Sequence, residues 1–154
     1  MVPAFWAIDS CCQMESKVLE AHRAHSIIGG FYEVYNYYGY GLVESVYTGA
    51  LEYELVDRGH SVVRELAVNV TYKGRHVAWQ RLDMVVDNRI ILEIKSGAVL
   101  PAFATRQLVN YLRATPFQLG LLLHFGPEAK FHRFVDSKKK RSRSGRETVG
   151  DGTW

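Results

Sequence analysis

The sequence predicts an α/β domain of the α+β kind, in which a mixed β-sheet is flanked by helices. Two stretches with helical periodicity come first, three stretches with strand character follow, and a further helix and two strands come last. The continuous apolar run at residues 119–123 is typical of a central strand that is covered on both faces. The expected order of elements is therefore α-α-β-β-β-α-β-β, within one domain that spans residues 16–136.

Two helices joined by a tight glycine turn are expected at the start of this domain. Apolar residues recur at helical spacing over residues 16–38, and Gly39 then offers a stop. A second helix is expected over residues 42–57, closed by Gly59. Residues 1–15 lack clear periodicity, so we predict a loose N-terminal arm there.

Three consecutive antiparallel strands are expected after the helices. Residues 64–72 alternate apolar and polar side chains, as a half-buried strand does. Lys73 and Gly74 turn the chain into a strand over residues 75–86, and a polar break at residues 87–89 turns it again into a strand over 90–96. The second and third strands therefore form a hairpin.

The remaining elements are a third helix, two strands and a tail. Residues 101–115 have helical character that ends at Pro116, and strands are expected over 118–125 and 129–135. Residues 137–154 are basic and low in complexity, which predicts disorder. Such a tail can contact phosphate groups, act as a transport signal or simply be solvated.

The charge and the cysteines narrow the class of protein. Residues 137–154 hold six basic and two acidic residues, whereas the rest of the chain holds 13 basic and 14 acidic ones, so the folded part is not globally basic. The only two cysteines are adjacent, which provides neither a disulfide framework nor a zinc-binding set. No apolar run approaches the ~20 residues of a membrane helix, and no basic segment precedes the apolar N-terminus. We therefore expect a cytoplasmic protein with no membrane partner.

Two acidic residues are expected to face each other across the predicted hairpin. A turn centred on Asn88 places Asp83 opposite Glu93 and Arg81 opposite Lys95. Directly opposed residues have Cβ atoms roughly 5 Å apart, and like charges so placed repel, so the pair needs a cation or one acid must hold a proton. A divalent metal ion is the natural candidate. The structural alternative is an ion-paired sheet face, in which Arg81 and Lys95 neutralise the acids.

Further polar side chains recur one helical turn apart on two of the predicted helices. Glu44 and Tyr47 lie near the start of the second helix, and Gln107 and Tyr111 lie on the third. From periodicity alone, Glu44 is better explained as an acid that complements the helix dipole. Gln107 is likewise explained as a boundary residue of an amphipathic helix.

In combination, these features resemble the PD-(D/E)XK nuclease superfamily, and more closely the small bacterial proteins named for a GxxExxY motif. The resemblance runs from about residue 27 to residue 135 and rests on five separately placed features in the same order. They are GxxExxY at Gly41–Tyr47, the triplet Arg81-Leu82-Asp83, Glu93-x-Lys95, Gln107-x-x-x-Tyr111 and the strand Gly120–Gly126.

The resemblance implies a restriction-endonuclease-like core and a nuclease that depends on Mg²⁺ or Mn²⁺. Asp83 and Glu93 are then metal ligands and Lys95 is the catalytic lysine. Glu44 is an additional acid that could join the metal ligands, and the backbone carbonyl of Ile94 is available as a further ligand.

The resemblance also implies a nucleic-acid substrate, expected to be DNA in repair, recombination or defence. Gln107 corresponds to the glutamine that lies beside the active site in RecB-type nucleases. Contacts with the substrate are expected from Tyr47, Arg81 and Tyr111, and a homodimer is compatible with the size of the domain. The alternative is a catalytically silent module of the same fold that binds nucleic acid or a protein partner.

Overall fold

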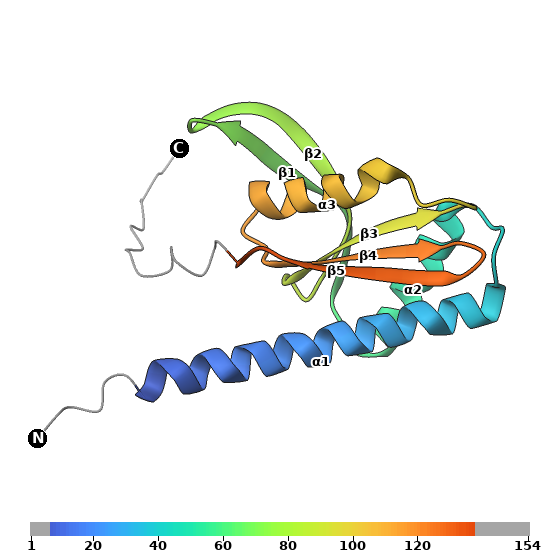
Figure 1. Ribbon diagram of the computed structural model, residues 1–154, viewed down its shortest axis with the longest axis horizontal. Coiled ribbons are helices and arrows are strands. Elements are labelled where there is room, and N and C mark those ends of the chain that lie inside the picture. Colours follow the sequence, from blue (N-terminus) through green and yellow to red (C-terminus); the bar gives the residue numbers. More distant parts are fainter. Residues whose placement is uncertain (1–6, 138–154) are drawn as a thin grey trace, which may run out of the picture.

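The computed structural model describes residues 7–137, with side chains described from residue 20 onward (Figure 1). The element order is the predicted one, and the mixed sheet flanked by helices is confirmed. The helices are α1 (Ala7–Tyr38), α2 (Glu44–Asp57) and α3 (Ala102–Ala114). The strands are β1 (Val62–Tyr72), β2 (Arg75–Val86), β3 (Ile90–Ser96), β4 (Leu119–Phe125) and β5 (Ala129–Val135).

The five strands form one sheet in the order β1-β2-β3-β4-β5. Strands β3 and β4 pair in parallel, and every other neighbouring pair is antiparallel. A parallel pair needs a crossover connection, which here contains α3. The seven residues of β4 are all buried, which confirms the central strand that the apolar run predicted.

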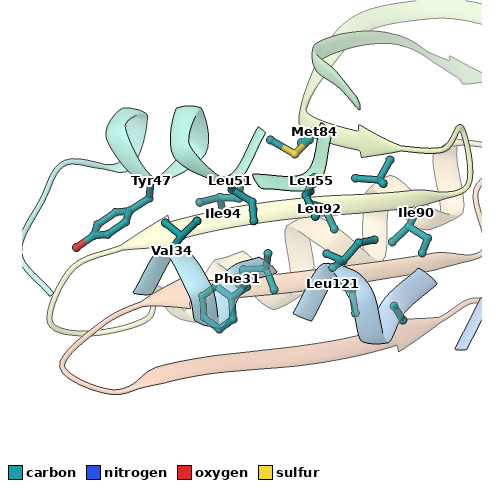
Figure 2. Close-up of a cluster of buried hydrophobic side chains, with 14 of the residues drawn as sticks. Phe31, Val34, Tyr47, Leu51, Leu55, Met84, Ile90, Leu92, Ile94 and Leu121 are labelled. Carbon is teal, nitrogen blue, oxygen red and sulfur yellow. The ribbon is translucent and has the colours of Figure 1, made fainter. Parts of the chain in front are cut away.

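The helices cover opposite faces of the sheet. Helices α1 and α2 pack on one face with alternate residues of β3, including Leu92 and Ile94, as Figure 2 shows. Helix α3 packs on the other face through Leu108, together with Ile91 of β3. Residues of β3 thus alternate between two cores, and Glu93 and Lys95 follow Ile91 on the α3 face.

Helix α1 begins nine residues earlier than predicted. The loose arm expected over residues 1–15 is therefore wrong from Ala7 onward. Residues 7–15 lack the apolar periodicity by which a helix is predicted, but the sequence has no glycine or proline from residue 7 to residue 28 that would end a helix. Residues 1–6 and the predicted tail from residue 138 onward lie outside the described residues. Within the described part, no helix is long and apolar enough to cross a lipid bilayer.

The turn between β2 and β3 is tied to the helical layer through Asp87. Its Oδ2 atom lies 2.8 Å from His60 Nδ1 and 3.3 Å from Arg23 Nε, and its Oδ1 atom accepts a 2.9 Å hydrogen bond from the Ser61 backbone N–H. His60 Nε2 in turn lies 2.8 Å from Ser26 Oγ of α1. This network holds the hairpin turn against α1 and against the segment that leads from α2 to β1.

We expect Asp87→Asn to lower the free energy of unfolding by about 2 kcal/mol at pH 7, because charge-assisted hydrogen bonds are lost. Burial alone would raise the pKa of Asp87, but the hydrogen bonds from His60 and Ser61 and the charges of His60 and Arg23 lower it below the ordinary 3.8. A lowered carboxyl pKa stabilises the fold above that ordinary value, and the stabilisation is lost as the pH falls through the folded-state pKa. Urea denaturation at pH 7 and pH 3 measures the difference, which should shrink in acid.

The matched control is Asp57→Asn, at the exposed end of α2, which should change the free energy by less than about 0.5 kcal/mol. A loss that is equally large at both pH values would contradict the role of the Asp87 charge.

Candidate active site

The predicted acid pair lies where β2 separates from β3. The two strands pair at three positions in the structure, Met84↔Leu92, Val85↔Ile91 and Val86↔Ile90. Each pair has the index sum expected for a turn centred on Asn88, so the predicted register is confirmed. The ladder ends there, and the next position in the same register would pair Asp83 with Glu93, whose carboxylates both lie near Lys95 Nζ.

Beyond that position β2 no longer pairs with β3 and pairs only with β1. The β1–β2 ladder runs through Arg64↔Met84 and Leu66↔Leu82 but skips Glu65, which stands opposite Asp83 and has a φ of 52°. A left-handed residue in a strand bends it locally, and β1 and β2 continue from this point as a two-stranded arm (Figure 1). The sequence carries no sign of this bend, because glutamate is not a residue type that favours positive φ.

The bend overturns the expected pairing of Arg81 with Lys95. Arg81 instead pairs with Ala67 of β1, and its side chain is 70% exposed, with Nη1 3.9 Å from Glu65 Oε2. The alternative in which Arg81 and Lys95 together neutralise the acid pair therefore keeps only Lys95.

A hydrogen bond to the β3 backbone holds Asp83 at this fork. Its Oδ2 atom accepts a 2.9 Å hydrogen bond from the Ile94 N–H of β3. This N–H lies on the edge of β3 where the β2 backbone has moved away. The carboxylate thereby takes the place of a ladder partner and is fixed beside Glu93 and Lys95.

Glu93 is a carboxylate that is removed entirely from solvent. Lys95 Nζ lies 2.6 Å from its Oε1 atom and 3.9 Å from Asp83 Oδ2, so one ammonium group sits between the two acids. Within residues 20–137, the Oε2 atom of Glu93 has no hydrogen-bond partner. A buried carboxylate oxygen without a partner is costly and is expected to have another ligand in the working protein.

The electrostatics of the site oppose two charged acids. The pKa of Glu93 is raised to about 7, because burial and the charges of Asp83 and Glu44 raise it and only Lys95 opposes them. Burial would lower the pKa of Lys95, but its hydrogen bond with Glu93 and the three acidic charges raise that pKa above 10.5. The lysine therefore stays protonated at neutral pH, whereas Glu93 titrates there.

Glu44 belongs to the same electrostatic site. It is the first residue of α2, is half-buried, and its charge acts on the pKa of both Glu93 and Lys95. Figure 2 shows that α2 runs along β3, with Tyr47 and Leu51 of α2 near the Ile94 end of β3. The start of α2 therefore lies near the end of β3 that carries the other site residues.

Tyr47, expected from the sequence to contact substrate, packs inside the protein. Its ring is fully buried and stacks on Phe125, with 4.2 Å between the ring centroids. Its hydroxyl donates a 2.6 Å hydrogen bond to the Gly39 carbonyl and accepts a 3.2 Å bond from the Leu42 N–H. Tyr47 thus shapes the loop that leads into Glu44, which the sequence spacing alone did not reveal.

Gln107 and Tyr111 contact each other on α3. Gln107 Nε2 donates a 2.7 Å hydrogen bond to the Tyr111 hydroxyl, and the Tyr111 ring is buried in the core on the α3 face. That face is the one toward which Glu93 and Lys95 alternate. Among the described residues, no hydrogen bond joins Gln107 directly to the acids or the lysine, so the structure brings it only to the same side of the sheet.

The donor set fits a hard divalent cation. Asp83 and Glu93 supply carboxylate oxygens, which Mg²⁺ and Mn²⁺ prefer, and the partnerless Glu93 Oε2 is an atom that such an ion would satisfy. In the part of the chain that is described, no three His, Cys, Asp or Glu side chains are already close enough to form a complete metal site. Any ion would therefore be held by the acid pair together with water, backbone or substrate oxygens.

An α+β domain with two acids and a lysine at a fork in its mixed sheet has the architecture of a nuclease fold. A family model described as the PD-(D/E)XK nuclease superfamily matches residues 21–134. The chain belongs to that superfamily.

No curated protein gives a significant match to the chain. Among solved structures, one described as "Crystal structure of SSO0001" aligns with 21% identity and a TM-score of 0.48. The alignment covers 60% of this chain and 50% of that chain, so it spans half the length of its match.

Proposed function

We propose that the protein is a Mg²⁺- or Mn²⁺-dependent nuclease that hydrolyses phosphodiester bonds, with DNA as the expected substrate. The observation that carries the proposal is the fully buried Glu93 carboxylate, which has a partnerless oxygen beside Asp83 and Lys95. This arrangement lowers the stability of the domain, and a bound cation would remove the cost. Membership of the nuclease superfamily supports the same activity.

In this proposal Asp83 and Glu93 hold the ion, with the Ile94 carbonyl and Glu44 as further candidate ligands. The ion supplies an activated water and relief of negative charge on the phosphate. The hydrogen bond from the Ile94 N–H keeps Asp83 in place during this work. Glu44, whose charge already reaches Glu93, would help to retain the ion.

Lys95 acts as a source of positive charge. Without a metal ion, its hydrogen bond with Glu93 and the acidic charges around it raise its pKa, which favours the protonated form. Its ammonium group donates hydrogen bonds to a phosphate oxygen, where negative charge grows in the transition state.

Gln107 is proposed to position water or a phosphate oxygen from the α3 side. Its amide nitrogen is held by the Tyr111 hydroxyl, which leaves the amide oxygen to face a proton donor. Tyr111 then acts through Gln107, because its ring is buried in the core.

Replacing Lys95 with methionine is expected to lower the cleavage rate by at least about a hundredfold, since one electrostatic donor to the transition state is lost. Purified protein is incubated with single- and double-stranded DNA and RNA in Mg²⁺ or Mn²⁺, and initial rates are measured with and without a chelator. Lys130→Met, on an exposed residue of β5, is the matched control and should cleave like the wild type.

Cleavage that persists undiminished in Lys95→Met would point to another site or to a contaminating enzyme. Binding of nucleic acid without cleavage under any metal, and without calorimetric evidence of metal binding, would instead support a catalytically silent module.

A further inference from the structure

The arm formed by β1 and β2 is the cationic part of an otherwise acidic domain. Residues 66–82 contain Lys73, Arg75 and Arg81 and no aspartate or glutamate. The rest of residues 1–136 contains ten basic and 14 acidic residues. Because the proposed site itself holds three acids, a polyanionic substrate needs positive charge elsewhere, and the arm supplies it.

One face of this arm is open to solvent along its length. Leu66 and Val68 point to the opposite face, where they pack against the α3 core. Across the ladder, Ala67 pairs with Arg81 and Asn69 with Trp79, so these four residues lie on the outer face. The side chain of Arg81 is 70% exposed and Trp79 is 65% exposed.

The His76 ring lies beside Trp79 on that face. His76 Nδ1 lies 2.5 Å from Asn69 Oδ1, and its ring centroid lies 5.5 Å from that of Trp79. A register shift between Val70 and Thr71 brings His76 opposite Thr71, on the same face as Asn69. The indole thus has the His76 ring beside it, while most of its surface is exposed to solvent.

Strand β2 connects the arm to the proposed active site. β2 runs from Trp79 through Arg81 to Asp83, and four residues of strand span about 13 Å. At the tip of the arm, Lys73 Nζ lies 5.3 Å from the centre of the Tyr72 ring. Strand β2 therefore joins the exposed Trp79 and Arg81 to Asp83, a candidate metal ligand.

We propose that this outer face, formed by Asn69, His76, Trp79 and Arg81, binds single-stranded nucleic acid. A base stacks on Trp79, and Arg81 pairs with a backbone phosphate. An exposed indole favours a single strand because the bases of a duplex are already stacked and paired, whereas unpaired bases offer their faces to aromatic rings. The inference rests on the proposed function, since it assigns the substrate class of the same site.

The first test measures binding by fluorescence anisotropy in EDTA, where cleavage cannot interfere. The probes are a labelled oligothymidylate and a duplex of the same length. Trp79→Ala should weaken single-strand binding about five- to a hundredfold, and Trp79→Phe should stay within about threefold of wild type. Tyr53→Ala, which removes an exposed aromatic ring from α2, is the matched control and should bind normally.

The charge contact is tested by the dependence on salt. Arg81→Gln should lower the slope of log K against log salt by about 0.7 for the single strand, as expected for one lost phosphate contact. Arg89→Gln, at the exposed turn between β2 and β3, is the charge-matched control and should leave the slope unchanged.

Stacking itself is read from tryptophan fluorescence. The chain has three tryptophans, so replacing Trp6 and Trp154 with phenylalanine leaves Trp79 as the only indole emitter. Oligothymidylate should quench its emission in proportion to binding. The proposal would be overturned if the emission stays unchanged at saturation or if Trp79→Ala binds with normal affinity. It would also be overturned if the duplex binds more tightly than the single strand and Trp79→Ala does not alter that binding.

These outcomes separate the arm from the active site. Metal-dependent cleavage combined with normal binding by Trp79→Ala would refute the role of the arm and leave the nuclease standing. Arm-dependent binding by a protein that cleaves nothing would refute the nuclease and leave the arm standing. Circular dichroism checks folding, and if Trp79→Ala does not fold, Trp79→Leu and Arg81→Gln carry the test.

Discussion

Asp83→Asn is expected to lower metal-dependent cleavage by at least about a thousandfold while the domain remains folded. The substitution removes one of two charged metal ligands, and charge stabilisation by the ion contributes several kcal/mol at about 1.4 kcal/mol per tenfold in rate. The asparagine oxygen can still accept the hydrogen bond from the Ile94 N–H, so the fork between β2 and β3 keeps its geometry.

Initial cleavage rates in Mg²⁺ and thermal unfolding of the same preparations measure the two halves of this expectation. Asp57→Asn serves as the control, because it removes an equal charge from an exposed position at the end of α2. Full activity in Asp83→Asn, or loss of activity only through unfolding, would show that Asp83 is not the metal ligand.

In the absence of divalent metal, raising the pH from 5 to 8 is expected to remove about 2–3 kcal/mol of stability through Glu93 alone. Burial raises the pKa of Glu93 from 4.5 to about 7, so the folded domain keeps a proton that the unfolded chain has already lost. The stabilisation is complete below pH 4.5 and is lost as the pH rises through about 7, at 1.36 kcal/mol per unit. The raised pKa of Lys95 lies above this window and does not contribute.

Other groups also titrate over this range, so the comparison is with Glu93→Gln, which keeps the shape and lacks the carboxyl. Urea denaturation at each pH gives the difference between the two proteins, and the other groups cancel in it. A difference that is constant from pH 5 to pH 8 would contradict a pKa near 7 for Glu93.

The same proton should compete with the metal ion. Because only ionised Glu93 can bind the ion, the apparent affinity for Mn²⁺ is expected to fall about tenfold from pH 8 to pH 6. Proton release per bound ion should rise from about 0.1 to about 0.9 over that range. Calorimetric titrations in buffers of different ionisation enthalpy measure both quantities, and affinity that does not depend on pH would rule out Glu93 as the ligand that titrates.

Much of the fold followed from local patterns. The three antiparallel strands, the buried β4 and the order of elements were predicted from alternation, apolar runs and turn residues. Alternation and apolar runs indicate which side of an element is buried, and turn residues indicate where it ends. The start of α1 was not, because an uninterrupted helix can continue where no packed stripe marks it. Strands β2 (Arg75–Val86) and β5 (Ala129–Val135) have the predicted bounds.

The residues of the candidate site were predictable where their positions follow from the hairpin register or from the order of motifs. The index sum of the hairpin placed Asp83 opposite Glu93, and the motif order added Lys95 and Glu44. The loss of the predicted pairing between Arg81 and Lys95 was not predictable, since it depends on the left-handed backbone of Glu65 in the adjacent strand β1.

By itself, the sequence determined a hairpin that must carry two facing acids, because a register set by a turn leaves no freedom over which residues oppose each other. Only the tertiary structure decided what those acids experience. Burial of Glu93 between two layers, the lysine that lies between it and Asp83, and the separation of β2 from β3 all arise from contacts between distant segments. Solvation and nearby charge depend on how the site is packed, and together they raise the pKa of Glu93 to about 7.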